Sequence, residues 1–86
     1  MPDKRVFAQQ VTVAADPVTV TFPIVNTEVP VGVQAGWTDN GAQYIANEFI
    51  YQLRIVKNID SISVTIAPRT SYPSVNMWVL LTVISP

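Results

Sequence analysis

Apolar and polar residues alternate in short runs along nearly the whole chain, and this period-two pattern constrains the fold more than any other feature. Successive side chains of a strand point to opposite faces, so such alternation predicts strands with one buried face. The clearest runs are Phe7–Val13, Val18–Phe22, Ile62–Ile66 and Val75–Ile84. Prolines and turn residues separate these runs at short intervals. We therefore predict an all-β fold, a small antiparallel sandwich or barrel of about six or seven short strands.

Two signals shape the middle of the chain. Pro30 interrupts a run in which valines alternate from residue 29 to residue 33. Because proline cannot donate a ladder hydrogen bond, this strand should lie at an edge or carry a bulge. Asp39-Asn40-Gly41 is the clearest turn signal, since Asn and Gly tolerate the positive φ of a tight hairpin. A second hairpin loop is expected at residues 57–60.

The segment from Gln43 to Lys57 has two interpretations. Apolar residues recur at three- and four-residue spacing, which is typical of an amphipathic helix. The second half, however, is rich in β-branched and aromatic residues, which favours a strand. We expect a strand from about Glu48 to Lys57, and one helical turn near residues 42–48 stays open as an alternative.

The last strand, Val75–Ile84, is apolar on both faces. Met77, Val79, Leu81 and Val83 share one face, and Trp78, Leu80 and Ile84 share the other. A strand with two apolar faces is expected to be buried on both, whereas a two-layer sandwich leaves one face of each strand toward solvent. The second face therefore needs a cover, which is a chain arm, the interior of a closed barrel or another subunit. The candidate interface residues are Trp78, Leu80 and Ile84, with Tyr72 and Arg69 from the preceding loop.

The composition limits how so small a chain can be stabilised. We expect one domain over residues 1–86, with residues 1–5 as a flexible arm. The chain has no cysteine and no histidine, which excludes disulfides and argues against a zinc site. Oligomerisation is the remaining common compensation in small folds, so we expect a homo-oligomer. Only 13% of the residues are charged and the net charge is −1, so we expect no nucleic-acid partner. The longest apolar run, Met77–Ile84, is too short for a membrane helix.

Few residues could carry out catalysis. Histidine, the commonest general base, is absent, and no two of the six carboxylates lie within four residues of each other. Ser61 and Ser63 are expected on the solvent-facing side of a regular strand, which is an ordinary place for serine. The three glycines do not have the spacing of a phosphate-binding loop. We therefore predict a protein that is not an enzyme and has no cofactor or metal.

An alternative function rests on the aromatic residues beside the Asp39-Asn40-Gly41 turn. Trp37 could stack on a sugar ring while Asp39 and Asn40 bond its hydroxyls, with Tyr44 beside them. This arrangement would make the chain a small carbohydrate-binding module. The competing interpretation, which we favour, is that Trp37 closes the end of the core over the turn.

Three features together give the chain its overall character. They are strands rich in Val, Ile and Thr at residues 18–22, 62–66 and 75–84, a short polar start at Met1–Arg5, and the lack of cysteine. In this character the chain resembles the small all-β decoration or cement proteins of bacteriophage capsids. The resemblance implies a virion structural protein, assembled in the host cytoplasm. It also implies trimeric or otherwise symmetric clusters bound over capsid-subunit junctions, where they stabilise the shell. Outside a virion, we expect a cytoplasmic protein.

Overall fold

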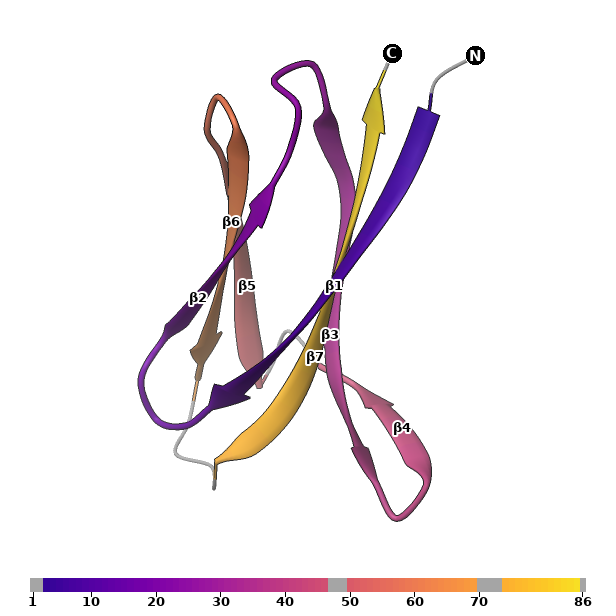
Figure 1. Cartoon of the computed structure of the whole chain (residues 1–86). Coiled ribbons are helices and arrows are strands. Elements are labelled where there is room, and N and C mark those ends of the chain that lie inside the picture. Colours follow the sequence, from indigo (N-terminus) through magenta and orange to yellow (C-terminus); the bar gives the residue numbers. More distant parts are fainter. Residues whose placement is uncertain (1–2, 47–49, 70–73, 86) are drawn as a thin grey trace.

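The described residues form seven strands in two antiparallel sheets that pack face to face, which confirms the predicted all-β sandwich (Figure 1). The computed structural model describes residues 3–46, 50–69 and 74–85. Sheet A has the strand order β1-β7-β3-β4, and sheet B has the order β2-β6-β5. The strands are β1 (Asp3–Val13), β2 (Val18–Pro23), β3 (Val29–Asp39), β4 (Ala42–Ile45), β5 (Tyr51–Lys57), β6 (Ser61–Pro68) and β7 (Val75–Ser85).

The core lies between the two sheets and is centred on strands β6 and β7, each of which has a neighbour on both sides. Alternate residues of these strands are completely buried. They are Ile62, Val64 and Ile66 of β6 and Met77, Val79, Leu81 and Val83 of β7. Full burial of each such side chain contributes about 1.5–3 kcal/mol. The alternation predicted for both strands is confirmed, and the Met77 face of β7 is the core face.

Strand β3 carries the two predicted signals. Its pairing with β7 shifts register between Pro30 and Gly32, which confirms the bulge. A two-residue hairpin joins β3 to β4, with Asp39 opposite Ala42. Asn40 and Gly41 have φ values of 50° and 79°, as a tight type I′ turn requires. The loop predicted at residues 57–60 is also present, because Asn58 donates its backbone N–H to the Ser61 carbonyl over 2.8 Å.

Two expectations need correction. Residues 42–45 form strand β4 and not a helical turn, because the Asn40-Gly41 turn folds them back onto β3. Residues 3–5 are not a flexible arm, because they pair with residues 83–85 of β7. The predicted strand near residues 48–57 is present as β5 from Tyr51 onward. Residues 47–49 lie outside the described part of the chain.

Candidate interaction surface

The two outer faces of the sandwich differ in the side chains that their central strands, β6 and β7, carry. The outer face of sheet B is mainly polar. Thr19 of β2 and Thr65 of β6 are paired, and their hydroxyls lie 2.9 Å apart. Gln52 and Arg54 of β5 extend this face. The outer face of sheet B is therefore an ordinary solvated surface.

The outer face of sheet A carries a group of apolar side chains among polar ones such as Gln10, Gln34 and Thr82. The register places Ala8 of β1 and Gln34 of β3 beside Leu80, and Val29 of β3 beside Ile84. The aliphatic side chains near its margins are well exposed, with Val6 at 58% and Ile45 at 61%. We call the following group the apolar outer face: Val6, Ala8, Val29, Ile45, Trp78, Leu80 and Ile84. The predicted interface residues Trp78, Leu80 and Ile84 thus lie side by side along β7, where each is half-buried.

The indole of Trp78 lies over Gly36 of the neighbouring strand β3. A Cβ atom built on Gly36 would approach Trp78 Cζ2 to 2.5 Å and the Tyr44 carbonyl oxygen to 2.0 Å. Only glycine fits between the ring and the backbone of β4. The Trp78 Nε1 atom is buried and has no hydrogen-bond partner in the structure. An unpaired buried donor of this kind is costly.

Two shallow hollows flank Leu80 on this face. One, of about 430 Å³, is lined by Gln43, Ile45, Trp78 and Leu80. The other, of about 280 Å³, is lined by Val6, Gly32, Val33, Gln34, Leu80 and Thr82. Leu80 therefore forms a ridge between two depressions. This relief suits packing against another protein surface more than it suits enclosure of a small molecule.

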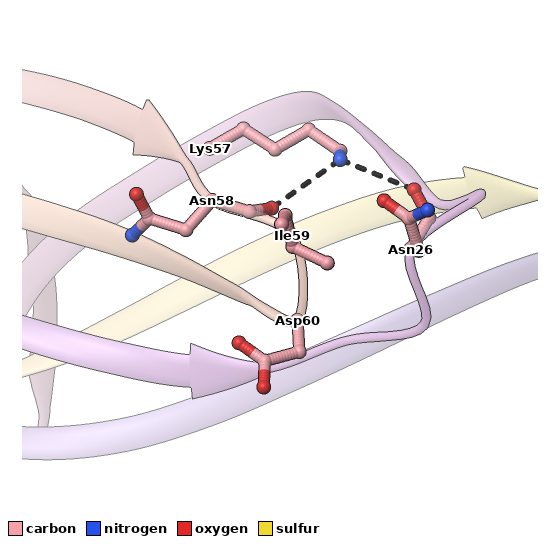
Figure 2. A pocket seen from close by; sticks show the side chains of 5 residues that line it. All are labelled: Asn26, Lys57, Asn58, Ile59 and Asp60. Carbon is pink, nitrogen blue, oxygen red and sulfur yellow. Dashed lines mark hydrogen bonds between the residues drawn. The ribbon is translucent and has the colours of Figure 1, made fainter.

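A third hollow, of about 570 Å³, lies between the β2–β3 and β5–β6 loops (Figure 2). It is lined by Asn26, Lys57, Asn58, Ile59 and Asp60. Lys57 Nζ donates to the backbone carbonyls of Asn26 and Asn58 over 3.1 and 3.4 Å. The ammonium group thus ties the two loops together, and the hollow is a wide surface depression at the end of the sandwich.

The strongest electrostatic feature is an ion pair that the sequence analysis missed. Arg5 of β1 donates two hydrogen bonds to Glu28, with N···O distances of 2.7 and 2.6 Å. Glu28, only 3% exposed, also accepts the Val25 N–H. The bonds from Arg5, followed by that from Val25, lower the pKa of Glu28 to about 2. The bond to Glu28 in turn raises the pKa of Arg5.

This pair fastens the first strand to the β2–β3 loop at the end of the core. The Arg5 guanidinium also lies 4.7 Å from the centre of the Phe7 ring, which in turn packs 6.0 Å from the ring of Phe22. Every charge of the pair is matched and hydrogen-bonded within the chain. The arrangement is typical of an ion pair that holds two segments of the fold together. No spacing signal could have revealed it, because the partners lie 23 residues apart.

The residues of the predicted carbohydrate site lie at the β3–β4 hairpin. Trp37 stacks on Tyr44 with ring centres 5.6 Å apart and planes 13° from parallel, and its ring meets Tyr51 edge-on at 6.2 Å. Trp37 also packs against the core. Asp39 and Asn40 are exposed at the hairpin. A sugar ring would therefore have to compete with Tyr44 for one face of Trp37.

Arg69, another predicted interface residue, lies elsewhere. Arg69 follows β6 and donates its backbone N–H to the Ile50 carbonyl over 2.8 Å, so it belongs to sheet B and not to the apolar outer face. Tyr72 lies outside the described residues.

Within residues 3–46, 50–69 and 74–85, no three potential metal-ligating side chains gather. The same residues include no helix long and apolar enough to cross a bilayer. No protein-family model matches the chain, and comparisons with curated proteins and with solved structures find no match either.

Proposed function

We propose that this chain is a non-enzymatic structural subunit of a larger protein assembly, which it joins through the apolar outer face of sheet A. The observation that carries this proposal is the contrast between the two outer faces. The outer face of β6, the central strand of sheet B, carries Ser61, Ser63, Thr65 and Ala67, whereas that of β7 in sheet A carries Trp78, Leu80 and Ile84 together with Asn76 and Thr82. Large apolar patches on a small protein mark sites of association.

Within this class we propose a virion protein of the capsid decoration or cement kind, which stabilises a shell by protein–protein contacts. A small β-sandwich, low charge and one apolar outer face support that assignment. The resemblance implies trimeric or otherwise symmetric clusters, and the symmetry of the assembly stays a prediction. A structural role of this kind requires no reactive group.

Density-gradient sedimentation from the native source tests this function. The tagged chain should sediment with a particle far larger than its own 9.5 kDa. Leu80→Asp places a carboxylate on the outer face of the central strand β7, and burying it against a partner would cost several kcal/mol. This variant should remain near the top of the gradient.

The matched control is Thr65→Asp, at the outer face of the central strand β6 in sheet B. It should sediment with the particle as the unchanged chain does. Sedimentation of the unchanged chain only as a small free species would contradict the proposal, as would equal behaviour of the two variants when both are folded.

A further inference from the structure

We infer that the apolar outer face of one copy packs against the same face of a second copy, which forms a two-fold dimer of four stacked sheets. The inference rests on the proposed function, because it names the occupant of the surface on which that function depends: the partner there is a second copy, and the dimer is the unit that enters the assembly. It goes beyond that function in stating that the purified chain needs no other protein to cover this face.

The size of the face meets the requirement of a stable dimer. Strands β1, β3 and β7 each have 11 residues. At a rise of about 3.3 Å per residue and a spacing of about 4.8 Å between strands, they present a flat footprint of about 500 Å². Two such faces bury about 1,000 Å² before side-chain relief and β4 are included, which reaches the level at which specific protein interfaces begin.

The charge distribution favours a copy of the same face as the partner. Among the described residues, Lys4 is the one charged side chain that the register places on this face, and it pairs with Ile84 near one end of β7. A long lysine at the rim can keep its ammonium group in water. A second copy presents the same uncharged centre, so association leaves no charge buried. A strongly charged partner would lose its own solvation against this surface.

The relief and the polar groups of the face also fit a second copy. Leu80 stands between two hollows, so a two-fold arrangement can set the ridge of each copy into a depression of the other. The face carries three exposed glutamines, Gln10, Gln34 and Gln43. These side chains can donate and accept hydrogen bonds across a contact between two copies.

Symmetry makes the inference specific. A patch that packs on itself forms an isologous contact, which requires a two-fold axis. A cyclic trimer would instead place this face against a different surface of the next copy. The mass of the assembly therefore separates the two arrangements, because a dimer has twice the 9.5 kDa mass of the chain and a trimer has three times that mass.

The experiment is sedimentation equilibrium of the purified full chain from low to high micromolar concentration. We expect a monomer–dimer equilibrium that Val6→Lys weakens at least about tenfold. Val6 is 58% exposed, so this variant should keep its fold, which circular dichroism would verify. Val56→Lys is the matched control, because Val56 is also an exposed valine on an edge strand, on the outer face of sheet B. It should leave the dimer unchanged.

A monomer at every concentration, a trimer, or equal dissociation constants for the two lysine variants would each overturn the inference. These results are distinguishable from failure of the proposed function. If the purified chain is a monomer but still sediments with its native particle through Leu80, the dimer is wrong and the structural role stands. If the dimer forms but the chain sediments with no particle, the dimer stands and the proposed structural role is wrong.

Discussion

Replacement of Gly36 by alanine should strongly destabilise the protein, because the neighbouring strand leaves no room for a methyl group. The new Cβ would lie 2.0 Å from the Tyr44 carbonyl oxygen and 2.5 Å from Trp78 Cζ2. An ordinary contact needs about 3.4 Å, so the backbone of β4 must move by more than about 1 Å and the indole must leave its position. Overpacking typically costs about 1–3 kcal/mol, and a clash with backbone belongs at the upper end of that range.

Gly32→Ala is the matched control, because Gly32 lies in the same strand and a Cβ built there meets nothing within 4 Å. Neither glycine has a positive φ. Both substitutions remove the same freedom from the unfolded chain, which is worth about 0.4–1 kcal/mol in favour of the folded state. The control should therefore be neutral or slightly stabilised, and the difference between the variants isolates the clash.

Thermal unfolding followed by circular dichroism measures this difference. For a domain of this size, 1 kcal/mol corresponds to about 4–8 °C in Tm, so a cost of about 3 kcal/mol predicts a loss of about 12–24 °C for Gly36→Ala. The melts should be compared at equal protein concentration, because a dimer gains stability by mass action. If the two alanine variants melt within about 2 °C of each other, well under the shift expected for 1 kcal/mol, the close approach of β3, β4 and Trp78 is refuted.

Substitutions at two further positions test local features of the fold. The folded-state pKa of Glu28, about 2, lies below its ordinary value of 4.5, so its stabilising contribution is present above about pH 4.5 and is lost as the pH falls toward 2. In urea titrations across that window, Glu28→Gln should therefore show a smaller loss of stability than the unchanged chain, and parallel profiles would contradict the ion pair. Asn40 has a φ of 50°. Because Asn tolerates this left-handed region better than other residues that carry a Cβ, Asn40→Ala should cost about 1 kcal/mol, whereas Asn40→Gly should melt close to the unchanged chain. Equal melting of both Asn40 variants would argue against the tight turn.

The strands were predictable because their signals are local. Alternation over residues 18–22, 62–66 and 75–84 identified β2, β6 and β7, and Asn40-Gly41 identified the β3–β4 hairpin. The same locality explains the error at residues 42–45. Their apolar spacing fits a helix as well as a strand, and the decision comes from pairing with β3, which a tight turn makes unavoidable.

Features that depend on the meeting of distant segments were not predictable. Residues 1–5 look like a polar tail in the sequence, yet Arg5 pairs with Val83 in the sheet and with Glu28 in the ion pair. Gly36 carries no turn signal, and its role becomes visible only when β4 and Trp78 are placed beside it. The sequence of β7 predicted which of its residues lie on the apolar outer face. That Val6 and Ile45 belong to the same face follows only from the strand order.

The difference between β6 and β7 supports the proposal that the apolar outer face serves association and not folding. Both strands are central in their sheets, and both bury one alternate set of residues completely. Strand β6 shows what the fold alone demands, because its other face carries Ser61, Ser63 and Thr65. Strand β7 meets the same demand with Met77 and its neighbours, yet places Trp78 and Leu80 on the opposite face. Since a polar set suffices at the equivalent positions of β6, the fold alone does not account for the second apolar set of β7, whereas the proposed partner that covers it would.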